Sequence, residues 1–133
     1  MAAIAKSGTP SISTLAPPNT CRRGSGLIAG EDLGAGDACY IKSDGKVWRS
    51  TGAAANAAAQ VDGYAEADVK SGRPVQLYEG VDWNYGSGMT PGTKVFLSGT
   101  TPGGIDTVAS TGGTGQIGRV IDANRIFLHK STY

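Results

Sequence analysis

One short phrase recurs three times in this chain of 133 residues and restricts its fold more than any other feature. Each copy has a central glycine, at Gly36, Gly72 or Gly92, with apolar side chains three and five residues later. Those apolar residues are Cys39 and Ile41, Val75 and Leu77, and Val95 and Leu97. Side chains two positions apart lie on one face of a strand. Each phrase therefore predicts a tight turn that leads into a half-buried strand.

An apolar residue also stands three positions before each of these glycines, and we expect it to fix the turn to the core. These residues are Leu33, Val69 and Met89. A weaker phrase, "VDGYAEAD" at 61–68 and "QIGRVIDAN" at 116–124, places a glycine inside a strand-like run. Such glycines are typical of β-bulges and strand crossings.

Further strands are expected at residues 46–49, 105–109 and 125–130. The 21 glycines and 6 prolines indicate many turns. Strands spaced by about 8–12 residues predict an all-β domain, a small β-barrel or sandwich. Residues 53–60, "AAANAAAQ", favour one short helix or turn lying on the barrel, with a plain loop as the alternative.

Residues 1–26 differ from the remainder and are expected to form an extended N-terminal arm on a β-rich domain at 27–133. They are rich in Ser, Thr, Pro and Gly, and they carry Lys6, Arg22 and Arg23 without any acidic residue. Pro10, Pro17 and Pro18 exclude a helix. Few large apolar groups offset the entropy of ordering, so we expect this arm to be mobile until a partner surface orders it.

Charge and cysteine content exclude several classes of function. The formal net charge is +1, which gives no bias toward nucleic acid or membrane. No apolar run approaches the roughly 18 residues that cross a bilayer, so we expect a soluble protein made in a cytosol. Cys21 and Cys39 are interpreted as buried or incidental thiols, with a disulfide as the alternative.

No catalytic, cofactor or metal site is predicted. Residues 113–118 match G-x-G-x-x-G, but a strand-like run follows, so a hairpin loop is favoured over a dinucleotide site. The only histidine, His129, leaves open a hydrolase with Asp122 or Asp106. A strand-surface or interface role is preferred for it. The acidic residues at 62, 66 and 68 are interpreted as solvated turn residues rather than acid–base or calcium ligands.

Trp83 and Tyr85 stand two apart, beside a glycine-rich loop. Core or intersubunit packing is the favoured interpretation, because large aromatic side chains dominate both. The alternative is a recognition module, carried by a virion tail or fibre, that binds a host surface or a glycan. In that case Trp83, Tyr85 and Tyr78 would form an exposed platform.

Four stretches together resemble the small head-decoration (capsid cement) proteins of tailed bacteriophages. They are "AGEDLGAGDACYIKSDGKVWRS", "VDGYAEADVKSGRPVQLYEGV", "GSGMTPGTKVFLSGTTPGGI" and "GQIGRVIDANRIFLH". The resemblance covers about residues 26–129 and consists of glycines and apolar positions. Cys39 stands where the family usually has an aliphatic residue. The resemblance implies a β-barrel or β-tulip-like body, trimers at local threefold positions, and arms that reach across neighbouring capsid subunits.

We therefore expect a structural virion protein rather than an enzyme, with no cofactor. It would be made in the host cytoplasm and would lie on the outer capsid surface, where it would clamp neighbouring subunits of its partner, the major capsid protein. Within the arm, Ile4, Ile12 and Leu15 are the candidate apolar anchors. Arg22 and Arg23 are the candidate charge contacts.

Overall fold

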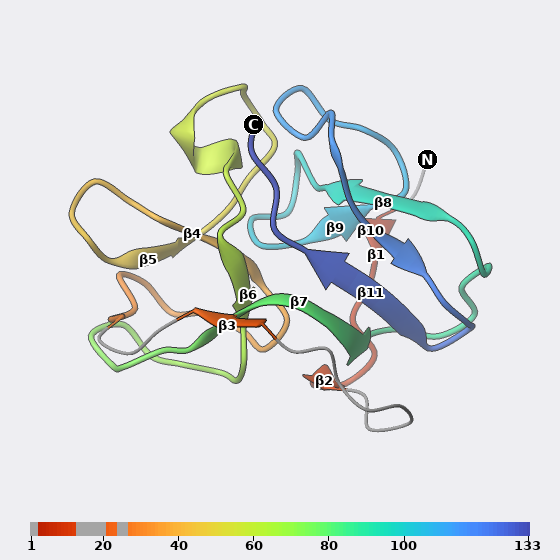
Figure 1. Cartoon of the computed structure of the whole chain (residues 1–133), viewed down its shortest axis with the longest axis horizontal. Coiled ribbons are helices and arrows are strands. Elements are labelled where there is room, and N and C mark those ends of the chain that lie inside the picture. The colour runs from red at the N-terminus through yellow and green to blue at the C-terminus, as the bar shows by residue number, and fades with distance from the viewer. Residues whose placement is uncertain (1–2, 13–20, 24–26) are drawn as a thin grey trace.

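A computed structural model describes residues 3–12, 21–23 and 27–133, which form a curled antiparallel sheet shaped like a half-barrel (Figure 1). The strands are β1 Ala3–Ile4, β2 Ser11–Ile12, β3 Cys21–Arg23, β4 Ala38–Ile41, β5 Val47–Arg49, β6 Gly63–Ala65, β7 Leu77–Asn84, β8 Lys94–Leu97, β9 Ile105–Asp106, β10 Gln116–Val120 and β11 Arg125–His129. The all-β prediction is confirmed. Among the described residues, no helix is long and apolar enough to cross a membrane.

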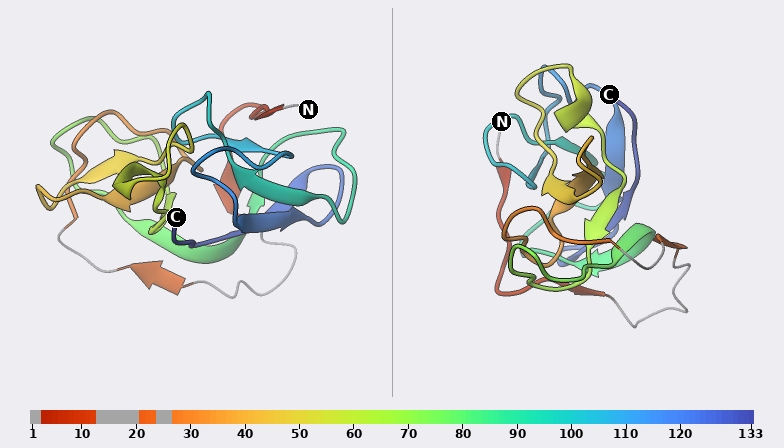
Figure 2. Two further views of the ribbon diagram at one scale, coloured as in Figure 1. Left: turned by 90° about the horizontal axis from the view of Figure 1, so that it is seen from above. Right: turned by 90° about the vertical axis from the view of Figure 1, so that its left-hand side faces the viewer.

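The sheet runs in the order β1-β9-β8-β10-β11-β7-β6-β4-β5, and β2 and β3 also pair with β7. Figure 2 shows the same ribbon from two further sides. The long strand β7 lies between β11 and β6 in this order and so connects β1, β9, β8, β10 and β11 with β6, β4 and β5. One of its edges pairs with β6 and then β11, whereas its other edge pairs with β3 and then β2. This arrangement places β7 at the centre of the fold.

The three repeated phrases form the turns that the sequence predicts. Gly36, Gly72 and Gly92 have φ angles of 79°, 85° and 84°. This left-handed conformation costs most L-residues roughly 1–2 kcal/mol, which is why glycine recurs there. The apolar positions that follow are buried or half-buried in all three copies.

The first two phrases also contact each other directly. Leu33 and Val69, which occupy the same position in their phrases, form an antiparallel bridge with N···O distances of 2.8 and 2.9 Å in the two directions. Both side chains pack in the same apolar cluster. The residues expected to fix two turns to the core therefore fix the turns to each other as well.

The glycines inside strands mark close approaches of the backbone. A β-bulge lies between Gln116 and Gly118, as the sequence predicts. A Cβ atom at Gly118 would lie 2.2 Å from the carbonyl oxygen of Phe127, so no larger residue fits. At Gly63 a Cβ atom would lie 2.8 Å from that of Leu77. These two positions hold neighbouring strands together more closely than a side chain would permit.

Two expected elements are shorter in the structure than in the sequence-based expectation. The alanine-rich stretch forms only a 3-10 helix, Ala57–Ala59, which the side chain of Asn56 caps. The strand expected at 105–109 ends at Asp106. Its carboxylate accepts a hydrogen bond from the Val108 backbone N–H at 3.1 Å, which turns the chain away from β8.

The buried side chains form two apolar clusters that meet along β7. The larger cluster includes Trp83, Tyr85 and Tyr64. The smaller cluster includes Leu77 and Val47 and lies under β4 and β5. Strands β4, β6 and β7 each contribute residues to both clusters, so these three strands link the two halves of the core.

The N-terminal residues lie on the body where they are described, which differs from the expected free arm. Strand β1 pairs with β9, whereas β2 and β3 pair with β7. Ile4 packs against the larger apolar cluster, and Pro10 is buried. The expectation of a free arm rested on its few apolar groups, whereas hydrogen-bonding groups on β7 and β9 also order it.

The candidate arm contacts are placed only in part. Ile12, Arg22 and Arg23 lie in strands β2 and β3. Leu15 lies outside the described residues. We use the term leader below for residues 3–12, the described part of the arm that precedes β3.

Candidate functional site

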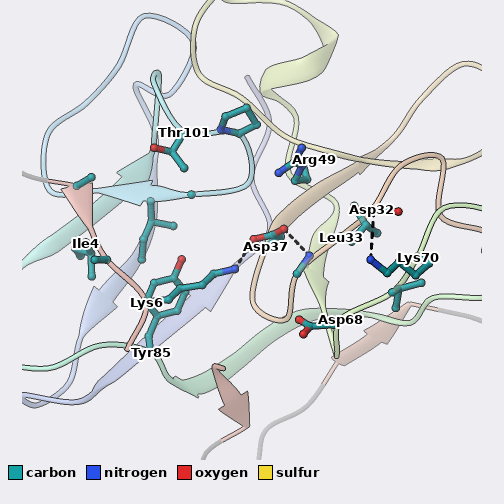
Figure 3. A pocket seen from close by; sticks show the side chains of 17 residues that line it. Ile4, Lys6, Asp32, Leu33, Asp37, Arg49, Asp68, Lys70, Tyr85 and Thr101 are labelled. Atoms are coloured by element: carbon teal, nitrogen blue, oxygen red, sulfur yellow. Dashed lines mark hydrogen bonds and ion pairs between the residues drawn. The ribbon is translucent and has the colours of Figure 1, made fainter. Parts of the chain in front are cut away.

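A cavity of about 760 Å³ lies between the leader and the loops of the body (Figure 3). Its walls are residues 3–6 of the leader, the first repeated phrase at 32–37, the turn at 68–70 and the loop at 101–105, and Arg49 and Tyr85 complete the lining. The site therefore draws on segments that are far apart in the sequence and that only the folded sheet brings together.

An ion pair between the leader and the first phrase is the central polar contact of this cavity. Nζ of Lys6 lies 2.5 Å from Oδ1 of Asp37, and the two side chains are 28% and 10% exposed. The other carboxylate oxygen of Asp37 accepts a hydrogen bond from the Gly34 backbone N–H at 2.7 Å. Because Asp37 is buried, loss of Lys6 would leave a carboxylate with little access to water.

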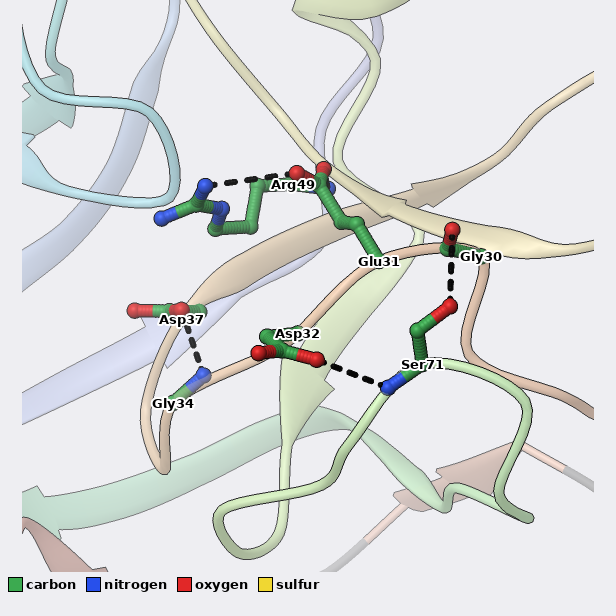
Figure 4. Close-up of polar contacts among 7 residues, drawn as sticks. All are labelled: Gly30, Glu31, Asp32, Gly34, Asp37, Arg49 and Ser71. Atoms are coloured by element: carbon green, nitrogen blue, oxygen red, sulfur yellow. Dashed lines mark hydrogen bonds and ion pairs between the residues drawn. The ribbon is translucent and has the colours of Figure 1, made fainter.

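A second ion pair joins Arg49 to Glu31 beside the cavity (Figure 4). Glu31 accepts from the Arg49 backbone N–H at 2.9 Å and from Nη2 of the same residue at 3.2 Å. Nε of Arg49 is buried and has no hydrogen-bond partner among the described residues. Nε of the guanidinium group is thus an unused donor within the site.

The remaining acidic side chains of the cavity hold loops in place. Asp32 accepts from the Ser71 backbone N–H at 2.9 Å (Figure 4), and this bond, together with the charge of Lys70, lowers the pKa of its carboxyl group. Asp68 accepts from the Ala35 backbone N–H at 2.9 Å. Each of these carboxylates ties one phrase to another, which is a structural role rather than evidence of acid–base chemistry.

A second cavity, of about 480 Å³, borders the leader at residues 3–7 and is walled by the loop at 87–90 together with Thr93, Thr107 and Val120. The leader thus lies in a groove with space beside it. Within this groove, the Ser7 backbone N–H donates to the Tyr85 carbonyl at 3.0 Å. Pro10 covers the first turn, where a Cβ atom at Gly36 would lie 3.2 Å from its Cβ. The groove therefore holds an extended segment through backbone pairing, one aliphatic side chain and one ammonium group.

Trp83 and Tyr85 pack in the core, in agreement with the favoured interpretation, and Tyr78 lies there with them. Trp83, Tyr85 and Tyr78 are 0%, 2% and 7% exposed. Burial and the nearby charge of Asp37 raise the pKa of Tyr85. The exposed ring platform that the recognition-module alternative requires does not form from these three side chains.

The polar residues considered for hydrolysis are engaged separately. Nδ1 of His129 lies 2.9 Å from the Lys130 carbonyl oxygen. Asp122 holds the side chain of Arg125 at 2.7 Å, and Asp106 caps the turn after β9. In the described part of the chain, no hydrogen bond joins His129 to either carboxylate, so the structure does not form the His–Asp pair that the hydrolase alternative would use.

Cys39 and the acidic residues Asp62 and Asp68 likewise have structural roles. Cys39 is a buried free thiol whose pKa is raised by burial, and its Sγ donates to the Asp37 carbonyl at 3.2 Å. Asp62 accepts from the Ile41 backbone N–H, whereas Asp68 binds a different loop. Among residues 3–12, 21–23 and 27–133, no three His, Cys, Asp or Glu side chains gather in a metal-binding group.

The fold and groove define the molecule as a small all-β domain that carries its own N-terminal strand in a charged groove. No protein-family model matches the chain, and no curated protein or solved structure is significantly similar to it. Asp37 was not predicted from the sequence as the partner of Lys6. A weak signal was present, because Lys6 is the only charged residue among the first 21.

Proposed function

We propose that this protein is a structural component of a virion that binds the outer surface of a bacteriophage capsid and clamps neighbouring major capsid subunits. It would act without a cofactor and would sit on the shell as a trimer after synthesis in the host cytoplasm. DNA packed inside a head pushes outward, and a rigid unit bound across subunit junctions would oppose their separation.

The observation that carries the proposal is the structural role of the residues that resemble decoration proteins. Gly36, Gly72 and Gly92 all form left-handed turns, and the strands after them supply buried apolar side chains. The resemblance therefore involves the framework of the fold, from the first phrase at the cavity to the last strand, β11. The curled antiparallel sheet is consistent with the barrel-like body that the resemblance implies.

The folded leader changes how the clamp would work. In the structure, Ile4 packs on the protein's own core, so it is not free to bind a capsid in this state. Strand β3 lies at an edge of β7 and carries Arg22 and Arg23. We place the initial capsid contact at this edge, because paired charges across an interface guide association and fix its register.

Cosedimentation with expanded, undecorated heads tests the proposal. The purified full-length protein is expected to pellet with intact heads and to saturate at a fixed number of copies per head. Saturable binding, followed by an increase in the temperature at which the heads disrupt, would support a stabilising role. Absence of binding to heads that remain intact would reject it.

A double substitution tests the charge contact. Arg22→Gln with Arg23→Gln is expected to weaken head binding by about tenfold, because surface charges contribute modestly to affinity. The matched control is Lys46→Gln with Lys94→Gln, which removes the same charge from two exposed positions outside the leader and β3. Equal affinities of the two variants would contradict the placement of the contact at β3.

A further inference from the structure

One row of side chains crosses the outer face of the sheet, the side of β10, β11 and β7 that points away from the core. Arg119 of β10 pairs with Phe127 of β11, and Phe127 pairs with Asp82 of β7. Side chains directly opposite each other in neighbouring strands project from the same face. The residues before and after each of the three are buried, whereas the three themselves are exposed or half-buried. The row therefore presents a cation, a ring and a carboxylate, in that order, to the surroundings.

The charges of this row do not pair within one chain. Arg119 and Asp82 are two strands apart, and strands are spaced by about 4.8 Å, so their backbones lie about 10 Å apart. Nε of Arg119 donates to the Gly92 carbonyl at 3.4 Å. Across the residues that the structure describes, no carboxylate pairs with Arg119 and no cation pairs with Asp82. Lys94 lies directly opposite Arg119, and like charges so placed are destabilising until an anion meets them.

The ring of Phe127 supplies an apolar centre between the two charges. It lies toward Gly80 of β7, where an added Cβ atom would be 3.6 Å from the ring carbon Cζ. The ring of His129 lies beside it, with 5.8 Å between the two centroids and 37° between the planes. Because Gly80 has no side chain that would cover the ring, an aromatic group from a partner can pack against it. Such aromatic pairs stabilise an interface beyond the area that they bury.

The order of the row is complementary to itself. Turning a second copy over about an axis parallel to β11 sets its ring on Phe127, its Arg119 over Asp82 and its Asp82 over Arg119. Each ion pair then occurs twice, as the self-complementary surface of a two-fold dimer requires. Two sheets packed face to face lie about 10 Å apart with nearly aligned strands, a spacing that side chains of this size fill.

We propose that two copies of this chain associate through the outer face of β7, β11 and β10, with Phe127 at the two-fold axis. A nucleic acid or a uniformly acidic protein fits this face less well, because it would set negative charge against Asp82. The contact needs no capsid, and it differs from the β3 contact and the threefold arrangement proposed above. It therefore goes beyond the proposed function, and either proposal can fail without the other.

Charge reversal at the two ends of the row tests the contact in the full-length protein. In sedimentation equilibrium up to millimolar concentration, the wild type is expected to show a monomer–dimer equilibrium. Asp82→Lys alone and Arg119→Glu alone each set like charges against each other twice, so each should weaken dimerisation by at least about tenfold. An equimolar mixture of the two variants restores both ion pairs and should dimerise about as strongly as the wild type.

Lys46→Glu, at an exposed turn before β5, is the matched control for charge and should dimerise like the wild type. A chain with both Asp82→Lys and Arg119→Glu carries the reversed row and should dimerise with itself, which separates lost pairing from lost folding. A wild type that stays monomeric at millimolar concentration would overturn the proposal. Dimers that persist unchanged in both single variants, or a mixture of these variants that stays monomeric, would also overturn it.

Discussion

Individual glycines in this chain fall into two groups with different physical roles. Gly72 has a φ angle of 85°, and a Cβ atom added there would meet nothing within 4 Å, so only its backbone conformation requires glycine. Gly118 needs glycine because the backbone of the neighbouring strand occupies the space. The first group is readable from a turn pattern, whereas the second depends on which strands become neighbours.

Gly118→Ala is expected to lower the free energy of unfolding by about 3 kcal/mol, because its Cβ atom would overlap the Phe127 carbonyl and force the strands apart. Gly80→Ala is the matched control within β7. Its Cβ atom would lie 3.6 Å from the ring of Phe127, an ordinary contact, so we expect a change within about 1 kcal/mol. Urea unfolding of the three proteins measures the difference. Similar losses in both variants would contradict the close approach at Gly118.

Asp122 provides a test of pH dependence at the same scale. The side chain of Arg125 and the backbone N–H of Asn124 donate to its carboxylate and lower its pKa. A group whose pKa is lower in the folded state contributes stability that is complete above its unfolded pKa and is lost as the pH falls through the folded value. That unfolded pKa is about 3.9.

Asp122→Asn is therefore expected to be less stable than the wild type near neutral pH. The difference should shrink as the pH falls below about 4. Urea unfolding of both proteins at a series of pH values gives the difference directly. A gap that stays constant down to the most acidic condition at which both still fold would count against the ionised pair.

Among the elements, the docked leader is the one that the sequence did not predict. The turns at Gly36, Gly72 and Gly92 and the strands after them were predictable because φ preferences and the two-residue repeat act locally. Docking of β1 on β9 depends on residues about a hundred positions apart. No local pattern in residues 1–26 shows that a hydrogen-bonding edge will be open for it. For the same reason, no local pattern identified Asp37 as the partner of Lys6.

Lys6→Met is expected to loosen the leader, because it removes the ammonium group and leaves Asp37 buried without that partner. Loss of the partner of a buried polar group typically costs about 1–3 kcal/mol, and more where the group is charged. We expect the Ser7 amide, which donates to the Tyr85 carbonyl, to exchange its hydrogen at least about tenfold faster. Lys46→Met, at an exposed turn, is the control and should leave this rate unchanged. Unaltered protection of Ser7 in the Lys6 variant would show that the ion pair does not hold the leader.

At the scale of the whole molecule, β7 makes the two apolar clusters dependent on each other. Leu77 lies in the smaller cluster, whereas Val81 and Trp83 lie in the larger one. Strands β6 and β11 both pair with β7, so neither half has a complete sheet without it. Strands β4 and β6 also place residues in both clusters, and a domain of this size with shared strands is expected to unfold in a single transition.

Trp48 and Trp83 permit a test of this coupling. In a Trp48→Phe protein the remaining tryptophan reports on the larger cluster, because Trp83 is buried there. Its fluorescence midpoint in urea should coincide with the loss of amide protection in β4 and β5, which cover the smaller cluster. Loss of β4 and β5 at a clearly lower urea concentration would show that the two halves unfold separately.

The pairing of β1 with β9 also sets an order of events during synthesis. The ribosome makes Ala3 and Ile4 about a hundred residues before Ile105 and Asp106. At about 5–20 residues per second, the nascent N-terminal segment waits roughly 5–20 s before its partner strand exists. A segment made early is thus among the last to find its place, and on a polysome it passes that interval close to other growing copies of the same chain.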